Sequence, residues 1–304
     1  MKELVVISGK GGTGKTSLVG SFAALAGSVV LADCDVDASD LPIILDPTIV
    51  ERHDFFQGHH ARIDAAGCAG CGACQNVCRF NAVHNDGPAN EWSRQTFRID
   101  SLACEGCGAC LQVCARDAIT MEPVLAGEWF VSDTRLGPLV HARLGPGGQN
   151  SGKLVSQVRQ KAHDLAKAHA AQFILVDGSP GIGCPVIASV ARANLVLIVT
   201  EPTPSGLHDM QRVIALTRHF NVPAMLCVNR WDLNPEQAAN IEIIAAQNNI
   251  VPAGRVRVDG VFNVAQRERR TVVEMVSTEV GQDIRQVWSY VATGLANIAQ
   301  GRQA

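Results

Sequence analysis

Residues 9–17 read Gly-Lys-Gly-Gly-Thr-Gly-Lys-Thr-Ser, which combines closely spaced glycines with a Lys-Thr pair. An apolar segment, 4–7, precedes them and a stretch of small apolar residues, 18–26, follows, so the pattern predicts a strand, a glycine-rich turn and a helix. Glycines let backbone N–H groups close around a triphosphate, and the helix N-terminus adds its positive dipole end. This predicts an ATP or GTP site in which Lys15 contacts the β- and γ-phosphates and Thr16 contacts Mg²⁺. The nucleotide-binding residues of this loop are Gly11, Gly12, Thr13, Gly14, Lys15, Thr16 and Ser17.

Eight of the eleven cysteines form two runs of the pattern Cys-x2-Cys-x2-Cys-x3-Cys, and the second run repeats the first at an offset of 36 positions (68 to 104). The spacing is typical of bacterial ferredoxins, in which the fourth cysteine of each run ligates the other cluster. The predicted ligands of one [4Fe–4S] cluster are Cys68, Cys71, Cys74 and Cys114, and those of its twin are Cys104, Cys107, Cys110 and Cys78. Zinc is the alternative, but zinc motifs separate their cysteine pairs by a longer loop.

Buried-strand patterns alternate with helical patterns along the rest of the chain, which predicts an α/β protein with a doubly wound, mostly parallel sheet. Expected strands cover 29–32, 173–176, 195–199, 224–228 and 255–258, and expected helices cover 151–165, 207–219 and 279–298. The cysteine repeat interrupts this pattern as an inserted α+β unit. We therefore expect a discontinuous nucleotide-binding domain, 1–59 and 123–304, and an inserted ferredoxin-like domain, 60–122. The stretch from 123 to 149 is glycine-rich and poorly periodic.

Polar residues follow the predicted strands at the points where an open parallel sheet places its ligand chemistry. Asp33, Asp35 and Asp37 come directly after the strand 29–32. Asp177 ends the strand 173–176, and one role for an aspartate at this point is to cap the following helix. Two roles are open for Asp33 and Asp37. Each can lie at the start of the following helix, or near Mg²⁺ without binding it directly.

Lys10 makes the loop more specific, because Lys-Gly-Gly-x-Gly-Lys-Thr resembles the deviant Walker A loop of the MinD, ParA, Mrp and nitrogenase iron protein superfamily. Cys-Asp-Val-Asp, the double cysteine repeat, Ser151-Gly152-Lys153 and Glu-Pro-Thr-Pro-x-Gly-Leu follow in the order found in members with an inserted ferredoxin domain. The resemblance implies a slow, partner-stimulated ATPase that forms an ATP-dependent homodimer, with Lys10 reaching the partner's nucleotide.

The same resemblance implies roles for residues beyond the loop. Asp35 would orient the attacking water, so the catalytic set is Lys10, Lys15 and Asp35. Asp177 would bind Mg²⁺ through water, and 178–181 would sense the γ-phosphate. Asn229 would contact adenine, with Asp232 beside it in an Asn-x-x-Asp pattern that is also a common turn.

Cys184 lies where the nitrogenase iron protein carries one ligand of a cluster shared between subunits. The companion cysteine is missing from 145–152, so a bridging cluster is not expected. Cys184 and Cys227 are instead expected to be buried structural thiols.

Composition excludes several classes of function. The chain has 304 residues, of which 47% are hydrophobic and 18% charged, and a net charge of −3 gives no basic stripe for nucleic acid. No apolar run approaches the roughly 20 residues of a membrane span. The first predicted strand begins at once, so we expect no signal peptide. Eleven cysteines in a chain without a secretion signal indicate metal binding and not disulfides. We expect a cytoplasmic protein.

These observations favour an ATP-driven electron-transfer or redox-switch protein with an unidentified redox or client partner, ATP/ADP, Mg²⁺ and two [4Fe–4S] clusters. A cluster or metal carrier is the first alternative, although carriers use a cysteine pair at the dimer interface. A MinD-like spatial organiser is the second, but the segment from Gln282 onward lacks the basic amphipathic helix that membrane attachment requires. An amidotransferase-type ligase shares the fold, but no glutaminase module is visible.

Overall fold

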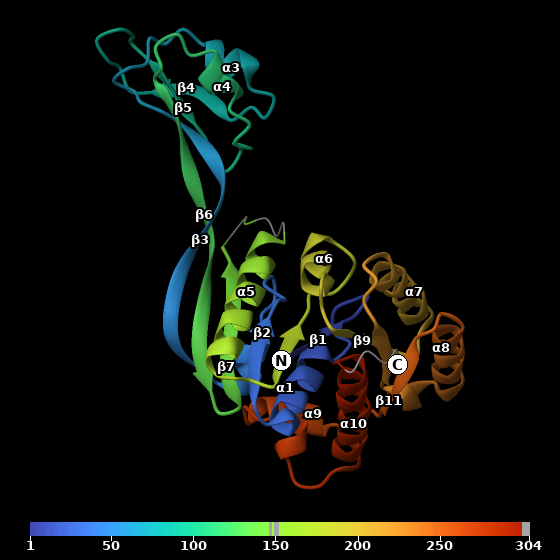
Figure 1. Ribbon diagram of the computed structural model, residues 1–304. Coiled ribbons are helices and arrows are strands. Elements are labelled where there is room, and N and C mark those ends of the chain that lie inside the picture. Colours follow the sequence, from blue (N-terminus) through green and yellow to red (C-terminus); the bar gives the residue numbers. More distant parts are fainter. Residues whose placement is uncertain (146–147, 149–151, 300–304) are drawn as a thin grey trace. The chain divides into compact units, whose positions relative to one another are not determined.

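The computed structural model describes residues 1–145, 148 and 152–299, and the side chain of residue 299 is not considered. Among these residues the chain divides into two compact units. The larger comprises 1–53, 128–144 and 152–299; the smaller comprises 54–127 with residues 145 and 148. Two strands of 16 residues each, β3 (Thr48–Ile63) and β6 (Ile119–Thr134), begin in one unit and end in the other (Figure 1).

A nine-stranded sheet runs through the described residues in the order β11-β10-β9-β1-β8-β2-β7-β6-β3. The pairs from β11 to β7 are parallel. These strands are β1 (Lys2–Ile7), β2 (Val29–Asp33), β7 (Gly137–Leu144), β8 (Phe173–Asp177), β9 (Leu195–Thr200), β10 (Ala224–Asn229) and β11 (Val251–Val256). The prediction of a doubly wound, mostly parallel sheet is confirmed.

Helices cover both faces of this sheet (Figure 1). The helices of the larger unit are α1 (Lys15–Ala26), α2 (Leu41–Leu45), α5 (Lys153–Ala168), α6 (Cys184–Val190), α7 (Pro204–His219), α8 (Pro235–Gln247), α9 (Val261–Arg267) and α10 (Glu279–Ala299), with short 3-10 turns at Trp231–Leu233 and Val272–Glu274. The helix expected from 151 begins at Lys153, and its proposed cap, Ser151, lies outside the described residues.

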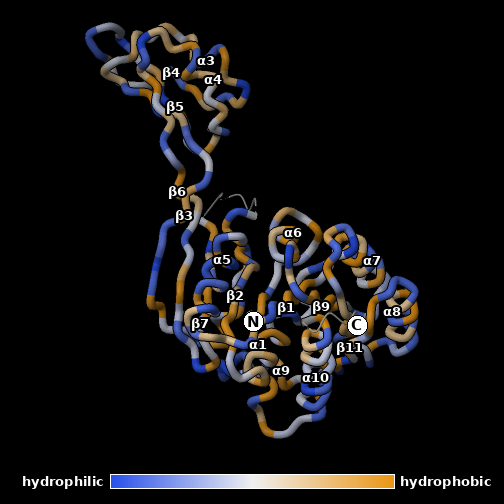
Figure 2. Tube along the Cα trace, in the orientation of Figure 1, coloured by the Kyte–Doolittle hydropathy of each residue, from blue (hydrophilic) through white to orange (hydrophobic). Residues whose placement is uncertain are grey.

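The core lies between the central strands and the helices that cover them. Residues 4–7 of β1 are completely buried, as a strand with neighbours on both edges and helices on both faces requires. Phe22 of α1 packs on Trp288 of α10, with ring centroids 5.3 Å apart. The central strands are hydrophobic, whereas α8 carries hydrophilic residues on its outer side (Figure 2). This core holds the loops at the strand ends in fixed positions.

Two expectations about the sheet are corrected. The poorly periodic stretch after 123 contains the second half of β6 and all of β7, which pairs in parallel with the fully buried strand β2. The last strand covers Val251–Val256 and not 255–258. The chain leaves the sheet after Val256, and the N–H of Val258 donates to the Asp232 carboxylate at 2.9 Å.

The smaller unit is built around the cysteine repeat. It contains an antiparallel pair, β4 (Val83–Gly87) and β5 (Thr96–Ile99), and two short helices, α3 (Ala73–Val77) and α4 (Ala109–Gln112). Its small core consists of cysteines and apolar residues, with Val83, Phe97 and Ile119 at the centre. No helix among the described residues has the length and hydropathy to cross a membrane.

Candidate nucleotide and iron–sulfur sites

The glycine-rich loop between β1 and α1 forms one wall of a cavity of about 830 Å³ in the larger unit. Gly12 and Gly14 have φ angles of 75° and 90°, which side-chain-bearing residues rarely adopt. A Cβ at Gly14 would lie 2.4 Å from the amide nitrogen of Asn229. Of the predicted loop residues, all line the cavity except Thr13, which is 1% exposed and lies beneath it.

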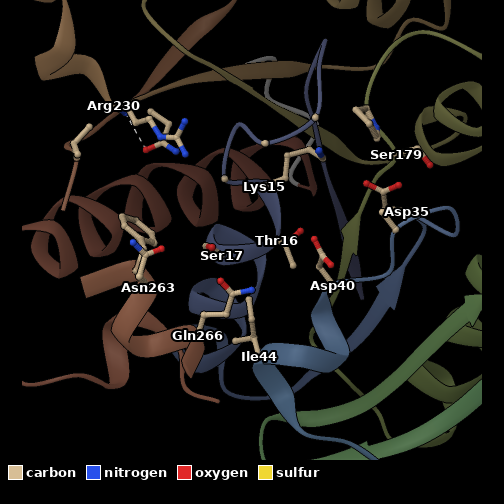
Figure 3. A pocket seen from close by; sticks show the side chains of 18 of the residues that line it. Lys15, Thr16, Ser17, Asp35, Asp40, Ile44, Ser179, Arg230, Asn263 and Gln266 are labelled. Atoms are coloured by element: carbon tan, nitrogen blue, oxygen red, sulfur yellow. Dashed lines mark hydrogen bonds between the residues drawn. The ribbon is translucent and has the colours of Figure 1, made fainter. Parts of the chain in front are cut away.

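Three acidic side chains line this cavity together with Lys15 and Thr16. Figure 3 shows two of them, Asp35 and Asp40. Asp35, Asp37 and Asp40 all come from the loop between β2 and α2. Burial raises the pKa of Asp35 to about 6, an effect that the Lys15 ammonium opposes and that Asp37 and Asp40 reinforce. This pKa places Asp35 near the range in which a carboxylate serves as a base, which suits its predicted role beside an attacking water.

Asp33 contacts the start of α2, as one of the two alternatives considered in the sequence, that of a helix-entry residue, expects. It is completely buried, and its carboxylate accepts hydrogen bonds from the Asp35 N–H, the Ser39 hydroxyl and the Leu41 N–H. These bonds fix the loop from 35 to 40 and the start of α2. Asp33 therefore positions Asp35 and does not line the cavity.

Asp177, at the end of β8, lies next to Asp33 in the parallel register. It is completely buried, and within the described residues neither carboxylate oxygen has a hydrogen-bond partner of normal geometry. Burial raises the pKa of Asp177 to about 7, although Lys15 and Thr16 act in the opposite direction. A buried carboxylate without a partner is costly, and a bound cation would compensate it. The pair Asp177 and Thr16 therefore fits the expected Mg²⁺ site.

The residues after Asp177 connect the cavity to both neighbouring strands. The Ser179 hydroxyl donates to the Cys34 carbonyl at 2.7 Å, and the Gly181 N–H donates to the Ser8 carbonyl at 2.9 Å. Ser179 and Pro180 line the cavity. A group bound between Lys15 and Ser179 would thus contact the loop after Asp177 directly.

Lys10 does not line the cavity. Its ammonium lies 2.9 Å from the Glu201 carboxylate, and the Arg230 guanidinium contacts the other oxygen of the same carboxylate. Glu201 is the first residue of the Glu-Pro-Thr-Pro sequence and is 8% exposed. In this conformation Lys10 is thus paired within its own chain.

Asn229 and Asp232 have different places in the structure, and only Asn229 lines the cavity. Asn229 is buried and its side chain donates to the Thr13 carbonyl at 2.7 Å, so it braces the glycine-rich loop at the edge of the cavity. Asp232 does not line the cavity; its carboxylate holds the backbone at Val258. Its predicted contact with the nucleotide stays a prediction.

Sequence reasoning missed the wall opposite the acidic loop. Arg230 from the loop after β10 and Asn263 and Gln266 from α9 line that side (Figure 3). Phe262, also of α9, lines the same cavity. An aromatic ring with neighbouring amide side chains suits a nucleotide base, which offers a flat face and polar edges. The short α9 carries no glycine-rich or acidic signature, so nothing in the sequence marked it.

The eight repeat cysteines divide between two cavities in the smaller unit. Cys68, Cys71, Cys74 and Cys114 line one cavity of about 230 Å³, and Cys104, Cys107, Cys110 and Cys78 line the other. Gly70 and Gly72 have φ angles of 66° and 76°, and Gly106 and Gly108 repeat them with 66° and 72°. Four thiols line each cavity, and four is the number of cysteine ligands that a [4Fe–4S] cluster takes.

A single bound metal ion fits these cysteines poorly. In the part of the chain that the structure describes, no three His, Cys, Asp or Glu side chains converge closely enough to hold one ion. Zinc would require tetrahedral ligands about 2.3 Å from the metal. The [4Fe–4S] assignment therefore rests on the spacing of the two cysteine runs and on the four thiols that line each cavity.

The three remaining cysteines differ in exposure. Cys34 and Cys227 are completely buried, and burial raises the pKa of Cys227 to about 12. Cys184 is exposed at the first position of α6, so the expectation of a buried thiol there is wrong. The helix begins at the surface with Cys-Pro, which leaves the sulfur outside the core.

Comparison with known proteins shows the family of the chain. The chain is 33% identical over 236 residues to the uncharacterized protein MJ0578 of Methanocaldococcus jannaschii, covering 76% of this chain and 79% of that protein. The chain belongs to the MJ0578 family. The 4Fe-4S dicluster domain model matches residues 67–118 of this family member, and these residues contain both cysteine runs.

Solved structures show the fold of the MJ0578-family chain. A chain of the MinC:MinD cell division protein complex of Aquifex aeolicus has a TM-score of 0.57 at 18% identity, covering 96% of each chain. MinD of Pyrococcus horikoshii, solved with Mg-ADP, has a TM-score of 0.56 at 15% identity, covering 98% of each chain. The chain thus has the MinD/ParA-type P-loop ATPase fold with a ferredoxin-like insertion.

Proposed function

We propose that the protein binds and hydrolyses ATP as a nucleotide-dependent homodimer and couples its nucleotide state to the redox state of two [4Fe–4S] clusters. The glycine-rich loop, the acidic loop and the unpartnered Asp177 support ATP hydrolysis with Mg²⁺. The two four-cysteine cavities support two clusters, which would supply one-electron transfer when bound. Mg²⁺ held by Thr16 and Asp177 would neutralise charge on the phosphates.

The coupling rests on one observation. The Val36 carbonyl, in the loop that carries Asp35, accepts a hydrogen bond at 3.4 Å from the N–H of Leu144, the last residue of β7. The next residue, Gly145, donates to the Ala126 carbonyl of β6 at 2.9 Å. β6 is the strand on which the chain returns from the cysteine repeat. Movement of the Asp35 loop would therefore shift β6 through these two hydrogen bonds.

A second connection runs through α2. Ile44 of this helix lines the nucleotide cavity, and β3 begins at Thr48, shortly after the helix ends. Near the start of β3, Arg52 shares the Glu128 carboxylate with Arg143, so that β3, β6 and β7 are tied together by one acidic group. Differential binding of ATP and ADP at the loop would shift the arrangement of these strands.

Within the nucleotide site, residues of this chain have distinct tasks. Lys15 binds the phosphates, and Asp35, with its raised pKa, orients water toward the γ-phosphate. Ser179 and Gly181 connect the phosphate position to β1 and β2 through their hydrogen bonds. Phe262, Asn263 and Gln266 hold the base, and Lys10 leaves Glu201 to reach the partner's nucleotide.

The test measures the potentials of both clusters anaerobically with ADP and with a non-hydrolysable ATP analogue. We expect a nucleotide-dependent shift, and a difference in ATPase rate between the reduced and the oxidised protein. The Lys15→Gln variant, which loses its phosphate contact, should show neither effect. Equal potentials together with equal rates would refute the coupling.

The contribution of Lys10 can be separated from nucleotide binding. Lys10→Gln should bind ATP with an affinity within a few-fold of the unmodified protein, because Lys10 lies outside the cavity of its own chain. It should lose ATP-dependent dimerisation and most hydrolysis. Lys167→Gln, an exposed change on α5, serves as the control. A Lys10→Gln variant that dimerises normally, measured by light scattering with the ATP analogue, would contradict the trans role.

The carrier alternative gains no support from the structure. In the larger unit, among the residues the structure describes, Cys184 is the one exposed cysteine. A carrier site between two subunits needs a pair of thiols from each chain, and Cys34 and Cys227 are inaccessible.

A further inference from the structure

The internal repeat allows the two cysteine cavities to be compared position by position. An offset of 36 residues relates Cys68 to Cys104 and Gly70 to Gly106. The relation also holds in the structure, since both glycines have the same φ angle of 66°. Differences between equivalent positions therefore report differences between the two sites.

Two pairs of equivalent positions line the cavities with different charge. The first cavity, that of Cys68, Cys71, Cys74 and Cys114, is lined by Ala69 and Arg116. At the equivalent positions the second cavity is lined by Glu105 and Phe80. The first cavity thus has one cation where the second has an aromatic ring, and the second has one anion where the first has a methyl group.

Neither charge is neutralised by a neighbour. Within the described residues, Arg116 and Glu105 take part in no ion pair. The Arg116 guanidinium lies over the Trp92 ring, with its central carbon 4.3 Å from the ring centroid, and this stacking holds its position without removing its charge. Arg79 and Asp117, which also neighbour the fourth cysteines, line neither cavity.

The loop between β4 and β5 adds to the difference. The Asn90 side chain donates to the carbonyls of Ala65 and Cys68, and Ser93 lies so close to Gly70 that a Cβ there would be 2.2 Å from its hydroxyl. On the second run the equivalent Gly106 faces the His59 carbonyl of β3. The Ala118 N–H also donates to the Cys114 sulfur at 3.4 Å, which places a further positive dipole at the first site.

We infer that the two cluster sites have different reduction potentials, with the higher potential at the Cys68, Cys71, Cys74 and Cys114 site. Reduction adds negative charge to a cluster, so a nearby cation and N–H···S contacts favour the reduced state, and a nearby anion disfavours it. The first electron taken up resides at the first site, beside Arg116 and Trp92. The charges of Arg116 and Glu105 set this order of the two reduction potentials. The inference rests on the proposed binding of two clusters.

The test is an anaerobic redox titration of the full chain followed by electron paramagnetic resonance. Two separate midpoint potentials are expected. Arg116→Phe, which copies the second site, should lower the higher potential and leave the other unchanged, and Glu105→Ala, which copies the first site, should raise only the lower one. All of the four positions to be exchanged are exposed, so these changes leave the small core intact.

The combined variant Ala69→Glu, Phe80→Arg, Glu105→Ala, Arg116→Phe exchanges the charges and should reverse the order of the sites. Two indistinguishable potentials in the unmodified protein, or single variants that shift neither signal, would overturn the inference while leaving the proposed coupling to nucleotide open to its own test. Binding of only one cluster per chain would overturn the proposed function as well.

Discussion

Asp177→Asn is expected to lower Mg²⁺-dependent ATP hydrolysis about a hundredfold or more. Asp177 is the completely buried acid at the end of β8, next to Thr16, and its carboxylate oxygens have no partner of normal geometry among the described residues. An amide has nearly the same shape but no charge with which to hold Mg²⁺ or its waters. Loss of metal-assisted charge stabilisation amounts to several kcal/mol, and each 1.36 kcal/mol is tenfold in rate.

Steady-state hydrolysis and binding of a fluorescent ATP analogue, each with Mg²⁺ and with EDTA, separate the two effects of this change. Binding without Mg²⁺ should be nearly the same for Asp177→Asn and the unmodified protein, because Lys15 and the loop amides remain. Asp164→Asn, an exposed change on α5, should leave turnover unchanged. An Asp177→Asn variant with normal Mg²⁺-dependent turnover would remove Asp177 from the site.

The same substitution should stabilise the nucleotide-free protein at alkaline pH. Burial raises the pKa of Asp177 to about 7, so the folded chain keeps its proton between pH 4 and 7 while the unfolded chain releases it. The free energy of unfolding therefore falls as pH rises through this window. Urea denaturation in EDTA measures the decrease in the free energy of unfolding between pH 4 and pH 8. This decrease should be smaller in Asp177→Asn than in the unmodified protein by a few kcal/mol. Equal pH dependence in both proteins would mean that Asp177 is paired in solution.

The parts of the site that could be predicted from the sequence are those formed by consecutive residues. The strand 4–7, the glycine-rich loop and α1 are set by local patterns, because the loop needs positive φ angles that only glycines supply easily. The cysteine runs are local in the same sense, and their grouping follows from the ligand rule for two-cluster ferredoxins.

The missed features depend on contacts between distant residues. Phe262, Asn263 and Gln266 line the cavity only because the fold brings α9, which follows β11, to the glycine-rich loop. The sequence of α9 has no distinguishing residue. The resemblance assigns Asn229 to the base, but the place of Asn229 at the end of β10 brings its side-chain amide to the Thr13 carbonyl. The sequence does not show whether the nucleotide base or the Thr13 carbonyl lies nearer to the Asn229 amide.

The long strands β3 and β6 were missed for a different reason. Strands are usually recognised by alternation of apolar and polar residues over a half-buried face. β3 contains His53, Gly58 and His59 and is mostly exposed along its length, so this alternation is weak. The regularity of β3 comes from pairing with β6, a strand that begins 56 positions after β3 ends (63 to 119).

Removal of a fourth cysteine is expected to abolish the cluster of the other run. Cys114 lines the cavity of Cys68, Cys71 and Cys74, although it belongs to the second run by sequence. Cys114→Ala should therefore lower bound iron from about eight atoms per chain to about four, because one of two [4Fe–4S] clusters loses a ligand. Cys78→Ala should have an equal effect through the second cavity. Cys184→Ala should leave the iron content unchanged.

Double variants decide between crossed and uncrossed ligation, because changes at one cluster do not add whereas changes at two clusters do. Cys114→Ala combined with Cys71→Ala should retain about four iron atoms, since both cysteines serve one cluster. Cys114→Ala combined with Cys107→Ala should retain almost none. The opposite result would assign Cys114 to its own run and would require the two cavities to exchange a cysteine on cluster assembly. Iron analysis and electron paramagnetic resonance of anaerobically reconstituted protein give this answer directly, and circular dichroism before reconstitution separates loss of a ligand from loss of the fold.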